Sequence, residues 1–169
     1  QASSLRSWQI GRFLAAQGHN VTVFAPGVDL RSGELFPEVR GKPFAEYDAE
    51  GVRLIRTWSL PNFRRSAKHR LAFELIYAFL SSLRALTIRP VDIVVVAYPP
   101  AVIPIFGYTV ARLLGVPVIF EMRDLMADAL VSTGYVSSTT IQGIAQRAEK
   151  FVAVHSDHII TVSKGIKDA

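Results

Sequence analysis

The sequence predicts an α/β fold, with a Rossmann-like, mostly parallel sheet that carries helices on both faces. From residue 91 onward, short apolar runs rich in β-branched residues alternate with segments of helical periodicity, which is the pattern of βαβ units. The apolar run 116–120 ends abruptly in Glu121, Arg123 and Asp124, as expected of a strand buried in a parallel sheet. In open α/β sheets, ligands bind in the crevice beyond the carboxyl ends of the strands.

Composition supports this class and excludes several others. The 169 residues fit one domain with a sizeable core, and 50% of them are hydrophobic, which is too apolar for a disordered chain. No apolar run is long enough to span a bilayer. Cysteine is absent, which excludes disulfides and thiolate metal sites and is compatible with a reducing cytoplasm. The net charge of +5 is typical of a soluble basic domain or of one whose partner is rich in phosphate.

The first half of the chain is predicted to begin with a helix over residues 5–17, in which Trp8, Ile10 and Phe13 lie near helical spacing and which Gly18 ends. Strands are expected at residues 21–25, 43–47 and 52–58, with a charged loop over 28–42 and a turn at 48–51. A long helix is then predicted over residues 66–87, where Phe73, Ile76, Leu80 and Leu83 recur every three or four residues.

The second half follows the alternating pattern. We expect strands at residues 93–97, 116–120 and 159–162, and helices at 101–114 and around 141–152, with Ser163, Lys164 and Gly165 opening a further helix. Pro104 is compatible with its helix only because it lies in the first turn. Because the chain opens on a helix and ends as another begins, we expect it to be a piece of a longer protein.

Three groups of polar residues are candidates for function. Glu121, Arg123 and Asp124 are expected to bind hydroxyl groups or to assist proton transfer; the alternative is an ion pair that fixes the following loop. The second group, Ser3, Ser4 and Arg6, lies in the small polar segment 1–6. We expect it to bind an anion at a helix N-terminus, although ordinary capping by Ser3 or Ser4 explains it too. The sequence contains neither a dinucleotide fingerprint nor a P-loop.

The third group is the basic run of Arg64, Arg65, Lys68 and Arg70. Cations at the start of a helix oppose its dipole, so local stability does not explain them. Together with nearby Phe63, Leu71 and Phe73, they suit contact with an anionic membrane surface; a solvated helix start is the alternative. Nucleic-acid binding is not expected, because no recognised module is present. The four histidines show no ligand spacing, so no metal site is expected.

Four segments together resemble the N-terminal domain of a GT-B-fold glycosyltransferase of family 4, similar to bacterial enzymes that assemble cell-surface polysaccharides. They are residues 4–23 with a Gly-His-x-Val join, 92–100 with a Pro-Pro loop, 120–125 with the order Glu-x-Arg-Asp-Leu, and 148–165 with a Ser-x-Gly turn. In such enzymes two Rossmann-like domains face each other across a cleft. The N-terminal domain mainly binds the acceptor, and the C-terminal domain mainly binds the nucleotide-sugar.

This resemblance implies transfer of a sugar with retention of configuration, without a metal or a permanently bound cofactor. It implies that Glu121, Arg123 and Asp124 line the cleft and that Arg6 faces donor phosphates. Many relatives place a histidine where Arg123 falls, so a histidine role does not carry over, and Asp124 is the better candidate for contact with the acceptor. The expected acceptor is a lipid-linked saccharide at the inner face of the cytoplasmic membrane, with the protein cytoplasmic or peripheral there.

The resemblance also implies that residues 1–169 lack the first strand of the domain and that the C-terminal donor-binding domain is absent. This chain alone is therefore expected not to catalyse transfer. Two other classes remain open: another GT-B enzyme, such as a nucleotide-sugar epimerase, and a non-catalytic α/β module that binds a membrane or a partner protein.

Overall fold

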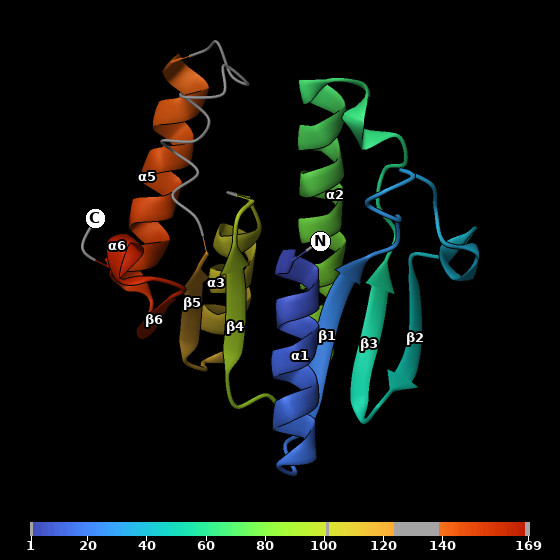
Figure 1. The fold of residues 1–169 in the computed structure, drawn as a ribbon, viewed down its shortest axis with the longest axis horizontal. Coiled ribbons are helices and arrows are strands. Elements are labelled where there is room, and N and C mark those ends of the chain that lie inside the picture. The colour runs from blue at the N-terminus through green and yellow to red at the C-terminus, as the bar shows by residue number, and fades with distance from the viewer. Residues whose placement is uncertain (1, 101, 124–138, 168–169) are drawn as a thin grey trace. The chain divides into compact units, whose positions relative to one another are not determined.

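A computed structural model of the chain describes residues 2–100, 102–123 and 139–167 (Figure 1). The chain divides into two compact units, Gln1–Ser81 and Ser82–Ala169. The described strands form two three-stranded sheets, one in each unit, where the sequence predicted a single sheet. Each unit is α/β, and three of the four described strand pairings are parallel, as the sequence predicted.

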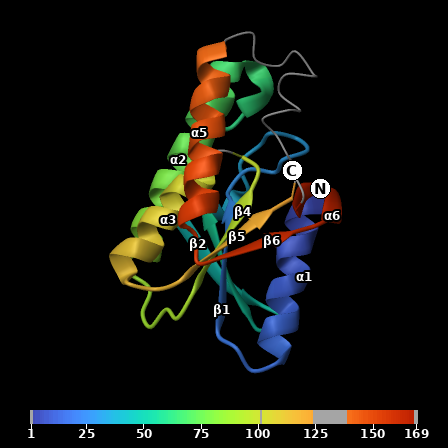
Figure 2. The ribbon, with the colours of Figure 1, turned by 90° about the vertical axis from the view of Figure 1, so that its left-hand side faces the viewer.

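The first unit contains helix α1 (Ala2–Ala16) and strands β1 (Val21–Pro26), β2 (Phe44–Ala49) and β3 (Val52–Thr57), followed by α2 (Ala67–Ala85). The strand order is β1-β3-β2. Strand β1 pairs with β3 in parallel, and β2 pairs with β3 antiparallel. Figures 1 and 2 show α1 on one face of this sheet and α2 on the other. The predicted α/β unit with helices on both faces is therefore confirmed.

Local sequence explains where these elements end. Gly18 has a φ of +88°, a conformation that favours glycine, and the amide of His19 donates to the carbonyl of Leu14 at 3.1 Å, which closes the last turn of α1. The turn between β2 and β3 uses Glu50 and Gly51, both with positive φ, as a two-residue antiparallel hairpin requires. These two stops lie where the sequence predicted them.

The predicted loop after β1 is packed against the rest of its unit. It contains the short helix η1 (Pro37–Val39), and Val28 and Val39 are fully buried. Val28 belongs to a small core with Phe63 and Phe73, whose rings stack with their centroids 4.5 Å apart. Phe63 begins a second short helix, η2 (Phe63–Arg65), so the chain just before α2 is anchored by aromatic packing.

The second unit contains β4 (Val94–Tyr98), α3 (Val102–Leu114), β5 (Val118–Met122), α5 (Thr139–His155), β6 (His158–Thr161) and α6 (Lys164–Lys167). The order is β4-β5-β6, and both pairings are parallel. Strand β5 is therefore central, and four of its five residues are buried. The prediction of a buried parallel strand that ends in Glu121 is confirmed.

The core of this unit lies between one face of the sheet and helices α3 and α5. Val96 and Phe120 are paired across the two strands and pack with Ala111 and Val152 from the helices. Helix α3 approaches the sheet closely at Gly107, where an added β-carbon would overlap the side chain of Val96. Glycine at this position is therefore explained by packing.

A polar contact holds the amino end of β5. The carboxylate of Asp157 accepts a hydrogen bond from the amide of Val118 at 2.9 Å and pairs with Arg112 at 3.2 Å. The hydrogen bond from Val118, followed by the charge of Arg112, holds the pKa of Asp157 below its ordinary value. This contact ties β5 and α3 to the segment between α5 and β6.

Candidate functional site

The candidate site lies at the carboxyl end of β5. Glu121 is the fourth residue of that strand, in register with Ala97 of β4. Its Oε2 accepts from Nη2 of Arg123 at 2.6 Å, and the side chains of Glu121 and Arg123 are only 5% and 10% exposed. The structure therefore brings together two of the three residues that the sequence predicted there, as a buried ion pair.

The burial of this ion pair determines its effect on stability. Removing two charges from water is costly, and a buried pair tolerates the loss of neither partner, since the remaining charge is left uncompensated. Loss of either partner is therefore expected to destabilise the carboxyl end of β5. The ion pair that the sequence offered as an alternative is present, while ligand binding by these residues stays a prediction.

A backbone hydrogen bond supports the same end of the sheet. The amide of Arg123 donates to the carbonyl oxygen of Tyr98 at 3.1 Å. Pairing between β4 and β5 therefore extends beyond the last paired residues of the two strands. Arg123 is held by both its main chain and its side chain.

The sequence did not predict the contact between Tyr98 and Glu149. Tyr98 is fully buried and packs edge-on against Phe120, and its hydroxyl donates to Oε2 of Glu149. A buried tyrosine hydroxyl normally requires such a partner. The available signal was the position of Glu149 three residues before Val152, which puts both residues on neighbouring parts of one helical face.

The other predicted site residues have different outcomes. Asp124 lies outside the described residues. The sequence predicted that Ser3, Ser4 and Arg6 lie in a segment just before a helix. The structure differs, because α1 begins at Ala2 and includes these three residues. The side chains of Ser3 and Ser4 are outside the described part of the structure, and Arg6 is half-buried in the first unit. Their contact with an anion stays a prediction.

Two residues of the basic run, Arg64 and Arg70, make contacts inside the protein. The guanidinium of Arg64 donates to the carbonyl oxygens of Leu30 and Arg31, and Arg70 pairs with Glu74 at 3.2 Å. Arg65 and Lys68 are exposed. Two of the four predicted membrane-contact residues therefore stabilise the first unit, and the membrane contact itself stays a prediction.

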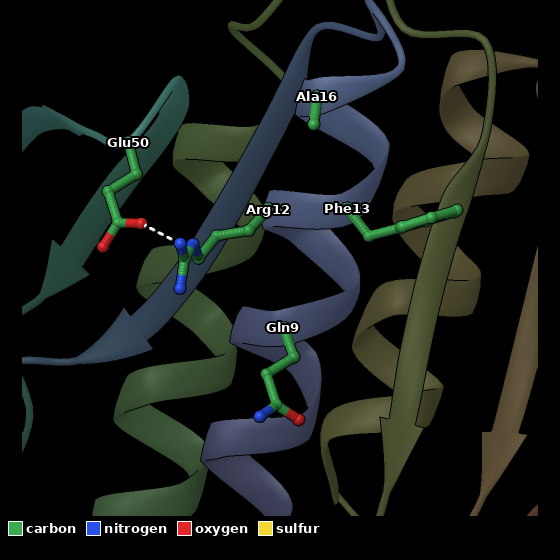
Figure 3. A pocket seen from close by; sticks show the side chains of 5 residues that line it. All are labelled: Gln9, Arg12, Phe13, Ala16 and Glu50. Carbon is green, nitrogen blue, oxygen red and sulfur yellow. Dashed lines mark ion pairs between the residues drawn. The ribbon is translucent and has the colours of Figure 1, made fainter.

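A shallow depression of about 380 Å³ lies on the first unit, lined by Gln9, Arg12, Phe13, Ala16 and Glu50 (Figure 3). An ion pair joins Arg12 to Glu50 across it. Glu50 lies in the turn just before β3, so the depression is at the amino end of that strand. It is therefore at the opposite end of the strand from the one that α/β sheets use for ligands.

Within residues 2–100, 102–123 and 139–167, no three His, Asp or Glu side chains gather closely enough to hold a metal ion. Among the helices that the structure describes, none combines the length and the apolar character needed to cross a bilayer.

The parallel sheet of the second unit and the buried polar pair at the end of its central strand define a Rossmann-like α/β domain of the kind that forms half of a GT-B fold. The chain belongs to the family of glycosyl transferase 4-like domains, whose family model matches residues 4–169. This confirms the resemblance inferred from the four sequence segments. A comparison with curated proteins found no match.

Proposed function

We propose that this chain is the acceptor-binding half of a retaining glycosyltransferase, which moves a sugar from a nucleotide-sugar to a lipid-linked saccharide at the cytoplasmic membrane face. Membership of the family supports glycosyl transfer in general. The observation that carries the proposal further is the buried pair of Glu121 and Arg123 at the carboxyl end of a central parallel strand, which is where this class of sheet binds ligands.

In this transfer the acceptor oxygen bonds to the anomeric carbon as the bond from that carbon to the donor phosphate breaks. The hydroxyl proton passes to the departing phosphate or to a nearby base. In our proposal Asp124 orients the acceptor hydroxyl, and Arg6 supplies positive charge that favours a phosphorylated ligand. The ion pair with Glu121 fixes the side chain of Arg123, the residue that precedes Asp124 in the sequence.

The test uses the full-length protein in membranes that contain its natural acceptors. A panel of radiolabelled nucleotide-sugars is supplied, and label that moves into lipid extracts is measured. We expect Asp124→Ala to lower the transfer by about 100-fold or more, in the range of a lost acid–base group. The matched control is Asp92→Ala, because Asp92 is an exposed acid just before β4.

Three results separate the proposal from its rivals. Transfer that requires the acceptor and falls only in Asp124→Ala supports it. Conversion of a free nucleotide-sugar to its epimer in the absence of acceptor assigns the protein to another reaction. Transfer that is unchanged in Asp124→Ala removes the acceptor role and favours a domain that only binds.

A further inference from the structure

The side chain of Arg56 is held in place by two aromatic residues of the first unit. Its guanidinium carbon lies 3.7 Å from the centroid of the Phe36 ring, which is a cation–π contact. Its Nε donates to the hydroxyl oxygen of Tyr47 at 2.7 Å. The main chain is fixed as well, because β3 is the central strand of its sheet and Arg56 is in register with a residue on each side (Figure 1). The guanidinium is therefore preorganised.

The two outer nitrogens of this guanidinium remain available. Among residues 2–100, 102–123 and 139–167, the side chain of Arg56 contacts only Phe36 and Tyr47, so neither Nη1 nor Nη2 has an acceptor there. Neither nitrogen is buried. A guanidinium presents its N–H groups as a rigid planar fork, which binds a carboxylate through two parallel hydrogen bonds. The end of Arg56 therefore has the geometry of a carboxylate site.

Other arginines of the first unit already have a carboxylate partner. Arg53 lies on the opposite face of the same strand, because side chains alternate along β3, and its Nη2 pairs with Glu46 at 2.6 Å. Arg70 pairs with Glu74 at 3.2 Å. Arg56 differs from both, since no acid in the described part of the chain neutralises it. A ligand that brings its own carboxylate would do so.

This site lies at the end of the sheet that α/β folds use for ligands. Arg56 is the fifth of the six residues of β3, and β1 runs parallel to β3. Phe36 belongs to the segment that follows β1, and its amide donates to the carbonyl oxygen of Gly27 at 2.9 Å. The guanidinium and the ring therefore meet near the carboxyl ends of two parallel strands.

The chemistry of the three side chains favours a sugar that carries a carboxylate. Aromatic rings beside a few fixed polar groups are typical of small-molecule sites, and the apolar C–H face of a sugar ring packs on an aromatic ring. The ring of Tyr47 is available for this, because Tyr47 is 36% exposed. One guanidinium neutralises the single charge of a carboxylate, whereas a phosphate monoester carries about two charges near neutral pH.

We propose that Arg56, Phe36 and Tyr47 bind an acidic sugar. Its carboxylate accepts hydrogen bonds from Nη1 and Nη2 of Arg56, and its ring packs against Tyr47. In the enzyme, this site selects an acceptor saccharide that contains a uronic acid. That role rests on the proposed function, whereas binding of an acidic sugar is measurable without donor or lipid.

The first experiment titrates the full-length protein with three probes: methyl glucuronide, methyl glucoside and glucose 6-phosphate. Calorimetry or saturation-transfer NMR gives each dissociation constant. The first two probes differ by one carboxylate, and we expect the glucuronide to bind at least roughly tenfold more tightly than the glucoside, as a charge-assisted pair of hydrogen bonds allows. The phosphate should bind more weakly than the glucuronide. Equal binding of glucuronide and glucoside, binding of neither, or a preference for the phosphate overturns the proposal.

Variants then assign the binding to this site. Arg56→Gln should weaken glucuronide binding by roughly tenfold, and Arg56→Lys should do nearly the same, because lysine keeps the charge but lacks the fork. The matched control is Arg53→Gln, an arginine of the same strand on its other face, which should bind as the unaltered protein does. Unchanged binding in Arg56→Gln, or an equal loss in the control, overturns the proposal.

A second measurement needs no variant. Phenylglyoxal modifies accessible guanidinium groups, and mass spectrometry reports the extent at each arginine. We expect methyl glucuronide to slow the modification of Arg56 but not that of Arg40, which is exposed in the loop before β2. Equal modification of Arg56 with and without glucuronide shows that its contact with Phe36 only stabilises the fold, and overturns the proposal.

The two proposals fail in different ways. A protein that binds glucuronide through Arg56 but transfers no sugar to lipid contradicts the proposed function alone. A protein that transfers sugar and yet does not bind glucuronide contradicts this inference alone.

Discussion

Arg123 is bound to Tyr98 through the main chain, since its amide donates to the Tyr98 carbonyl oxygen at 3.1 Å. The hydroxyl of the same tyrosine donates to Glu149 of α5. Tyr98 therefore connects the end of β4 to two other elements, the residue that follows β5 and the helix that precedes β6. This connection holds the carboxyl end of the sheet together at the candidate site.

The hydroxyl of Tyr98 should contribute measurably to stability. Tyr98→Phe leaves the half-buried carboxylate of Glu149 without this donor, and we expect a loss of about 1–3 kcal/mol in the free energy of unfolding. Chemical denaturation measures the change. In Tyr98→Phe/Glu149→Leu the unsatisfied carboxylate is also gone, so much of the loss should be recovered. A single variant as stable as the unaltered protein would show that the hydrogen bond contributes nothing.

The close approach of α3 to the sheet predicts the effect of Gly107→Ala. The added methyl group overlaps Val96, and overpacking of this kind costs about 1–3 kcal/mol. The control is Gly143→Ala in α5, where a β-carbon meets no described atom within 4 Å and alanine should stabilise the helix. Val96→Ala should partly rescue Gly107→Ala. Equal stability of the two alanine variants would contradict the packing.

The lowered pKa of Asp157 predicts a dependence of stability on pH. Its pKa in the folded protein lies below the ordinary value of 3.8, so its charge stabilises the fold above that pH, and this contribution is lost as the pH falls through the folded-state pKa. Asp157→Asn should therefore melt at a lower temperature than the unaltered protein near pH 7, and the difference should shrink in acid. A difference that is constant from neutral to acidic pH would refute this assignment.

Periodicity predicted the elements well because each depends on a local pattern. The β-branched run that became β5 and the glycine that ends α1 both act within a few residues. The hydrogen bonds from Arg64 to loop carbonyls and from Tyr98 to Glu149 were not predictable in this way, because they join residues 33 or more positions apart.

Helix α2 shows a different limit of sequence patterns. The predicted stripe of Phe73, Ile76, Leu80 and Leu83 includes a residue that is 47% exposed. A helix that is apolar nearly all round has no single stripe, so its pattern does not identify the buried side. The exposure of Leu71, Leu75 and Phe79, at 48%, 42% and 53%, became known only from the structure.

The most direct measurement concerns the buried pair of Glu121 and Arg123. Arg123→Ala alone should destabilise the fold by about 3–5 kcal/mol, because a buried ion pair loses one of its two charges. Glu121→Leu/Arg123→Met replaces both charges with apolar side chains, and stability should then equal or exceed that of the unaltered protein. This double variant therefore separates folding from function.

We predict that the full-length double variant folds and melts normally but loses sugar transfer to lipid by about 100-fold, because the ion pair that precedes Asp124 is gone. A double variant that is both stable and fully active in the membrane transfer assay would contradict a role for the end of β5 in glycosyl transfer.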